Sequence, residues 1–152
     1  MREYALQLVY AFFGSLGFAL IFHLRRRYLF TSSLGGLLSW GVFLLIQSAH
    51  PGTFFPAVAA SAFVCVYSEV FARIKKTPAN QYLVVGLLPL IPGGPLYYSM
   101  RGLVVRDGAM AQQYGYSLAM YALGIAVGVS ATLSLAEMIF SIIKMRKKKL
   151  QK

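Results

Sequence analysis

The sequence predicts an all-α integral membrane protein with five transmembrane helices, the fourth of them broken. Of its 152 residues, 58% are hydrophobic and only 12% are charged, against about 25% charged in an average soluble domain. The mean hydropathy is +0.63. The apolar residues also form runs of about 20, the helix length that crosses about 30 Å of hydrocarbon. We therefore expect a single transmembrane domain over residues 1–152.

Four apolar runs are long enough to cross a membrane without interruption. They cover residues 4–22, 31–49, 54–72 and 114–143. Each is expected to be helical, because backbone groups in lipid must find hydrogen-bond partners within their own segment. A fifth apolar stretch, residues 81–104, is interrupted by Pro89, Pro92, Gly93, Gly94 and Pro95. It is predicted as a broken fourth span.

Most of the basic residues lie in blocks that follow alternate spans, and Arg2, Arg101 and Arg106 lie outside these blocks. With the acidic residues they give a net charge of +11. These blocks are residues 25–27, 73–76 and the tail 144–152. Basic blocks next to spans are orientation signals, so the net charge does not indicate a nucleic-acid partner. Five spans place all three blocks in the cytoplasm, with the N-terminus outside and the C-terminus inside. The tail is also expected to attract anionic lipid.

A re-entrant hairpin at residues 81–104 is the alternative to a crossing. It would return to the cytoplasm, and the last span would then carry the basic tail outside, against the charge rule. The sequence therefore favours a crossing and leaves the re-entrant arrangement open.

The break is the strongest candidate for a binding site. Eleven residues precede Pro92 and ten follow Gly94, so each half-helix covers about half of the bilayer at 1.5 Å per residue. Secondary transporters bind carboxylates at half-helix N-termini near the membrane midplane. Pro95 suits the first turn of the second half-helix, whose free amides are expected at Leu96, Tyr97 and Tyr98, joined by those of Gly93 and Gly94. A kink that serves only helix packing is the alternative.

The candidate substrate-binding residues lie at the break and at the start of the first half-helix. They are Pro92, Gly93, Gly94, Pro95, Tyr97, Tyr98, Ser99, Arg101 and Asn80. Tyr97, Tyr98 and Ser99 offer hydroxyl groups, while Arg101 is either an anion-attracting residue or an interfacial anchor. Asn80 is alternatively an N-cap at the cytoplasmic surface.

Two acidic residues lie within other predicted spans and are candidates for proton coupling. Glu69 lies four residues before Arg73, which favours an ion pair, whereas Glu137 has no obvious local partner. Gly124 and Gly128 form a GxxxG pair that predicts close helix packing. No metal-ligand cluster or nucleophile–base pair is visible, so the sequence predicts neither a cofactor nor an enzyme.

The stretch KTPANQYLVVGLLPLIPGGPLYYSM, residues 76–100, resembles the signature region of the threonine/serine exporter superfamily. Its flanks, FGSLGFALIFHLRRR and SEVFARIKKTPA, and the short chain are similar to the family's smaller YjjB-type membrane subunit. The matching positions are Glu69, Thr77, Pro78, Ala79, Pro89, Pro92, Gly93, Gly94 and Tyr97. The resemblance implies a larger exporter-domain membrane subunit as the partner.

The expected function is therefore that of a subunit in a two-component secondary exporter of the cytoplasmic (inner) membrane. The resemblance implies export of small carboxylated metabolites, either threonine and serine or succinate-like dicarboxylates. The alternative is a membrane scaffold that stabilises a larger partner while the partner carries the whole substrate site.

Overall fold

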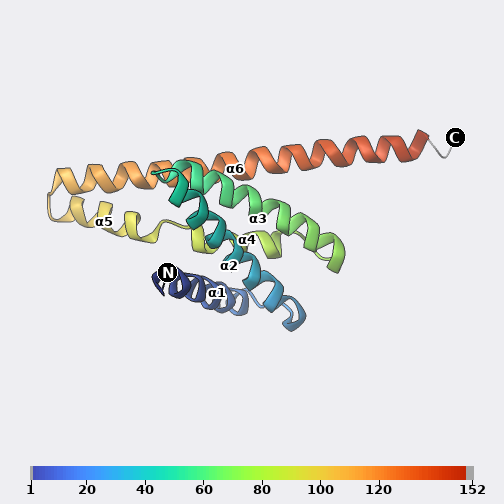
Figure 1. Cartoon of the computed structure of the whole chain (residues 1–152), viewed down its shortest axis with the longest axis horizontal. Helices are drawn as coiled ribbons and strands as arrows, with labels where there is room; N and C mark the ends of the chain where they lie inside the picture. Colours follow the sequence, from blue (N-terminus) through green and yellow to red (C-terminus); the bar gives the residue numbers. More distant parts are fainter. Residues whose placement is uncertain (1, 150–152) are drawn as a thin grey trace.

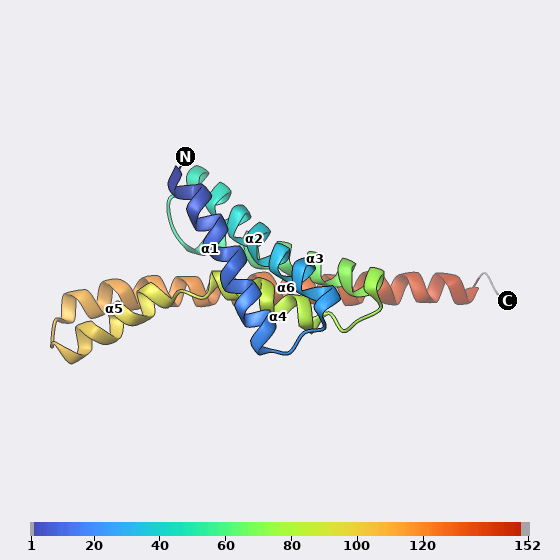
Figure 2. The same cartoon turned by 90° about the horizontal axis from the view of Figure 1, so that it is seen from below.

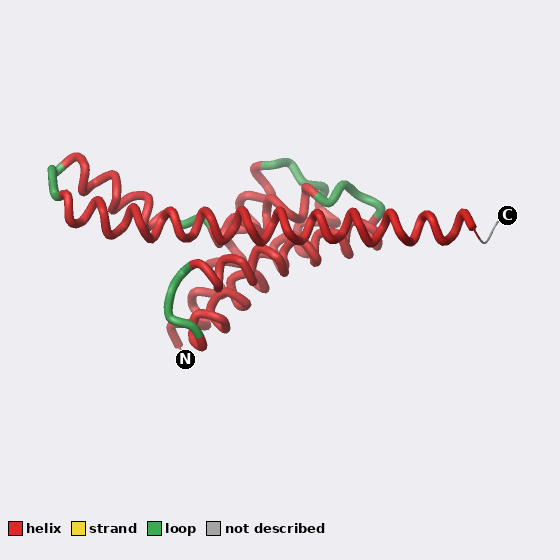
Figure 3. Tube along the Cα trace, turned by 90° about the horizontal axis from the view of Figure 1, so that it is seen from above, coloured by secondary structure: helices red, strands yellow, loops and turns green. Residues whose placement is uncertain are grey.

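The computed structural model describes the backbone of residues 2–149 and the side chains of residues 3–138. The described chain is helical, without a strand (Figure 3). Its elements are α1 (Arg2–Ile21), α2 (Arg26–Ala49), α3 (Phe54–Lys75), α4 (Asn80–Leu87), the 3-10 helix η1 (Leu88–Leu90), α5 (Gly93–Val104) and α6 (Gly108–Lys149). The expected lipid contacts of the basic tail fall on side chains outside this described part.

The predicted all-α fold with a broken helix is confirmed. Four helices, α1, α2, α3 and α6, are long and apolar enough to cross a membrane. The segments Asn80–Leu90 and Gly93–Val104 together pass the same test, and they are bent by 54° where they meet. The structure therefore holds four or five spans, and a full crossing by the bent pair stays a prediction.

Helix α2 lies at the centre of the bundle, where it packs against α1, α3 and α4. Buried Phe43 on α2 meets Ala57 and Ala60 on α3 and Leu90 on η1. The Phe43 ring also stacks on Tyr121 of α6, with centroids 5.4 Å apart. The end of η1, immediately before the break, is therefore held in the same apolar cluster as the long helices.

Helices α5 and α6 form a hairpin that projects from the other helices. Both Figures 1 and 2 show α5 and the first part of α6 extending to the left beyond α1, α2 and α3. Among the described residues, α5 packs against α6 and makes no comparable contact with another helix. The backbones approach closely at Gly102, where an added Cβ would lie 2.6 Å from the Ala111 nitrogen.

The last helix begins at Gly108, six residues before the predicted start of the span at 114. Asp107 explains the difference, because its carboxylate accepts a hydrogen bond from the Met110 amide at 3.0 Å. Aspartate is a favoured residue at helix N-termini for this reason. The polar residues at the start of α6 are therefore helical even though they lie outside the apolar run.

Small residues set the packing of α6 on α3. An added Cβ at Gly124 would lie 2.8 Å from the Ala57 Cβ, and one at Gly128 would lie 2.1 Å from the Ser61 Oγ. Both contacts join the GxxxG pair to the alanine- and serine-rich face of α3. The absence of side chains at these two glycines is what lets the helices come together.

Candidate functional site

The break between α4 and α5 is built by its prolines. The helix tightens to a 3-10 turn at Leu88–Leu90, which contains Pro89. Ile91 then adopts an extended conformation, with φ −65° and ψ 121°, because a residue that precedes proline is disfavoured in the α region. Pro92 has φ −78° and ψ 65°, and the Gly93 amide donates to the Ile91 carbonyl at 2.8 Å. These values describe an inverse γ-turn.

Helix α5 begins at Gly93 instead of at Pro95, and this changes which amides are free. Leu96, expected to offer a free amide, donates to the Pro92 carbonyl at 3.0 Å, so that expectation is wrong. Tyr97 and Tyr98 lie beyond the first turn, where amides donate to the helix's own carbonyls. Pro95 has no amide hydrogen. Among the described residues, Gly94 keeps the one first-turn amide without an acceptor.

The predicted substrate residues after the break lie on an exposed helix surface. Gly93 and Gly94 are exposed, and no atom outside their local backbone lies within 4 Å of a Cβ added to either. Tyr97 is 61% exposed, and Tyr98 is 39% exposed. The Tyr98 ring stacks on Tyr114 of α6, with centroids 5.0 Å apart. The surface after the break is thus open on the side away from α6.

Two further candidates after the break differ in their surroundings. Ser99 is buried, and its hydroxyl donates to the Leu96 carbonyl at 3.0 Å. Arg101 is exposed in the last turn of α5. Of these two side chains, Arg101 is therefore the more accessible to an anion.

Asn80 begins the first segment of the bent pair, at the end of that segment that is far from the break. It is the first residue of α4, and Ala79 takes the N-cap position, so the expected capping role of Asn80 is wrong. The segment Asn80–Leu90 is about 16 Å long at 1.5 Å per residue. The structure therefore does not bring Asn80 together with the residues after the break.

Sequence reasoning missed two residues that hold the first half of the broken helix. Ser39 of α2 is fully buried, and its Oγ lies 2.8 Å from the carbonyl oxygen of Gly86 in α4. Gly86 approaches so closely that an added Cβ would lie 2.8 Å from Val64 of α3. The available signal was the spacing of Gly35, Gly36 and Ser39, which puts small residues on one face of α2.

A groove of about 110 Å³ runs along the break on the side of α1. Leu88 and Pro89 form one wall, and α1 residues from Tyr10 to Phe18 form the other. Ser15 lines this groove, and its Oγ is buried without a hydrogen-bond partner. The groove adds little polar chemistry to the break, because most of its lining is apolar.

The two coupling candidates differ in their surroundings. The Arg73 guanidinium donates to the Glu69 carboxylate one turn away in α3. Glu137 lies on an exposed face of α6. Glu69 therefore has a local counter-charge, whereas Glu137 faces the side from which lipid or another protein approaches.

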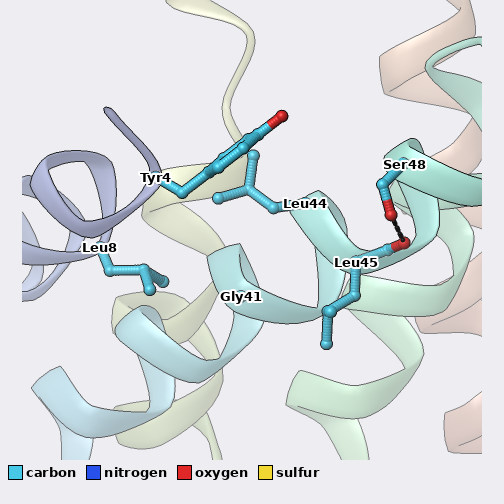
Figure 4. A pocket seen from close by; sticks show the side chains of 6 residues that line it. All are labelled: Tyr4, Leu8, Gly41, Leu44, Leu45 and Ser48. Carbon is cyan, nitrogen blue, oxygen red and sulfur yellow. Dashed lines mark hydrogen bonds between the residues drawn. The ribbon is translucent and has the colours of Figure 1, made fainter. Parts of the chain in front are cut away.

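Two of the larger grooves, both away from the break, have mainly apolar linings. One of about 390 Å³ lies between α1 and α2, where Tyr4, Leu8, Leu44 and Leu45 give it an apolar wall (Figure 4). The other, of about 450 Å³, lies between α3 and α6 beside Glu69. Their linings suit hydrocarbon better than a carboxylate. Within the described residues no group of three His, Cys, Asp or Glu side chains is placed to hold a metal.

The comparisons with known proteins identify the family. Residues 7–135 match the family described as threonine/serine exporter, ThrE. Neither the curated proteins nor the solved structures give a match. The family is one of transporters, and the matched region spans α1 to the greater part of α6. Since the match covers well over half of the chain, the protein belongs to the threonine/serine exporter family ThrE.

Proposed function

We propose that the chain is one subunit of a two-component secondary exporter that moves small carboxylated metabolites out of the cytoplasm. Family membership supports threonine and serine as substrates, and succinate-like dicarboxylates share the carboxylate that the break would recognise. The proposed location is the cytoplasmic membrane, with the N-terminus outside and the C-terminus inside.

The exposed start of α5 is the observation that carries this proposal. Gly93 and Gly94 are exposed, and the Gly94 amide has no acceptor among the described residues. Inside hydrocarbon an unsatisfied backbone group costs several kcal/mol, unless protein or a water-filled cavity surrounds it. A substrate carboxylate is a fitting acceptor for this amide, because the N-terminus of a helix attracts negative charge.

The same exposure supports a partner subunit. Among the described residues, α5 packs against α6 and makes no comparable contact with another helix, so this part of the chain does not enclose a polar cavity around Gly94 from both sides. A larger exporter-domain membrane subunit would supply the missing wall. If that subunit begins inside and ends outside after five spans, the two form an inverted pair of the kind that many transporters use.

An export assay tests the proposal. A strain that lacks both subunits is loaded with serine, threonine or succinate, and the intracellular pool is followed with this chain expressed alone and then with its partner. We expect the pool of at least one substrate to fall only when both chains are present. Equal pools in all strains would refute the proposed function.

A scaffold role is the second candidate, because the predicted substrate residues lie at the surface and not in an enclosed cavity. In that case the partner carries the substrate site and this chain only stabilises it. Both candidates predict co-purification of the two chains, so labelling near the break has to separate them.

Proton coupling is proposed to run through Glu137. An intramembrane carboxylate that can release and regain a proton is suited to this task, whereas Glu69 is held by Arg73. We expect export by the Glu137→Gln variant to lose its dependence on the proton gradient, while Glu69→Gln keeps it. The measurement is export with and without a protonophore, and unchanged dependence in Glu137→Gln would remove the assignment.

A further inference from the structure

The Ser39 hydroxyl has two acceptors on different helices. Its Oγ lies 2.8 Å from the Gly36 carbonyl oxygen in its own helix and 2.8 Å from the Gly86 carbonyl oxygen in α4. A serine hydroxyl carries one proton, so it fully donates to one of these oxygens at a time. Both oxygens lie in the buried centre of the molecule, where an unpaired polar group is costly.

The Gly86 carbonyl lies where α4 loses its regular hydrogen bonds. In a regular α-helix the Gly86 carbonyl would accept from the Leu90 amide, four residues later, but Leu90 lies in the 3-10 turn Leu88–Leu90, where amides donate to the carbonyl three residues back. Carbonyl groups at such a transition need partners from outside the helix. The Ser39 hydroxyl on α2 supplies such a partner to the Gly86 carbonyl, in the last turn of α4 before the break.

Among the described residues, no other serine hydroxyl donates a hydrogen bond to a carbonyl of another helix. Ser33, Ser48, Ser61 and Ser99 all donate to carbonyls in their own helices. Ser33 is the closest comparison, because it is also buried in α2 and donates to Leu29 at 2.8 Å. The link from Ser39 to α4 is therefore a property of this position and not of buried serines in general.

We propose that Ser39 is a positioning residue that holds the first half of the broken helix against α2 and can release it. When α4 moves away, the proton turns to the Gly36 carbonyl, and the hydroxyl is never left unpaired. The Ser39 hydroxyl therefore keeps an acceptor whether or not α4 lies against α2. The importance of this release for transport rests on the proposed function, whereas the attachment of α4 does not.

Hydrogen exchange on the full chain in lipid nanodiscs tests the attachment directly. In the Ser39→Ala variant, the amides of residues 80–91 are expected to exchange about fivefold faster than in the wild type, the factor that corresponds to about 1 kcal/mol. Ser39→Thr keeps the hydroxyl and should restore slow exchange. Ser33→Ala is the matched control, and it should leave the exchange of these residues unchanged.

Export by the same variants, each expressed together with the partner subunit, tests whether the attachment of α4 to α2 matters for transport. We expect Ser39→Ala to change the export rate severalfold, and Ser39→Thr to restore it. Unchanged exchange in Ser39→Ala, or an equal increase in Ser33→Ala, would overturn the proposal. If the wild type exports nothing, the proposed function fails, while the exchange data still decide whether Ser39 holds α4.

Discussion

Replacing Gly93 and Gly94 together by leucine is expected to abolish export while membrane insertion stays at the wild-type level. The chain itself has room for both side chains, because no atom outside the local backbone lies within 4 Å of an added Cβ at either position. Neither glycine has a positive φ, so the backbone is not strained. The loss of export would come from blocking access to the Gly94 amide. Export and the amount of membrane-inserted protein are the two measurements.

Leucine at Gly17 and at Gly115 provides matched controls for this double substitution. Both glycines lie in membrane helices and also have nothing within 4 Å of an added Cβ. We expect these variants to insert and to export like the wild type. Normal export by the Gly93→Leu/Gly94→Leu variant would remove the assignment of the break as the substrate site.

The Gly128→Leu substitution is expected to separate α6 from α3. Its Cβ would lie 2.1 Å from the Ser61 Oγ and 2.5 Å from the Val58 carbonyl oxygen. One of these obstacles is backbone, so a side-chain rotation cannot remove the clash. Overpacking of this kind costs about 1–3 kcal/mol. Thermal unfolding in detergent should show a clearly lower midpoint than for the wild type.

Gly115→Leu is also the control for this experiment, because it adds the same side chain to the same helix at an open position. Its unfolding midpoint should match that of the wild type. A wild-type midpoint for Gly128→Leu would show that the contact between α3 and α6 differs from the one described here.

The sequence predicted the fold class and the position of the break because both depend on local chemistry. Apolar runs of about 20 residues predict spans, and prolines with adjacent glycines interrupt a helix whatever surrounds them. The close helix packing predicted for Gly124 and Gly128 has a counterpart in their contacts with Ala57 and Ser61 of α3. The early start of α6 was missed because the apolar run begins after it, although Asp107 is a local signal for a helix start.

The details of the break could not be read from the sequence. The number of free amides depends on where α5 begins, and the γ-turn at Pro92 moves this start to Gly93. The bond between Ser39 and Gly86 joins residues 47 positions apart, so it follows from tertiary packing and not from a motif. The projection of the α5–α6 hairpin likewise depends on the 54° bend.

Protection of the break by substrate tests most directly whether this chain contributes to the substrate site. Cysteine is introduced at Tyr97 in a Cys65→Ala background, and at Leu103 in the same helix as a control; both native side chains are exposed. In membranes that contain both subunits, we expect threonine, serine or succinate to slow labelling at position 97 and to leave position 103 unchanged. Active export with equal labelling at position 97, with and without substrate, would contradict this account and favour the scaffold.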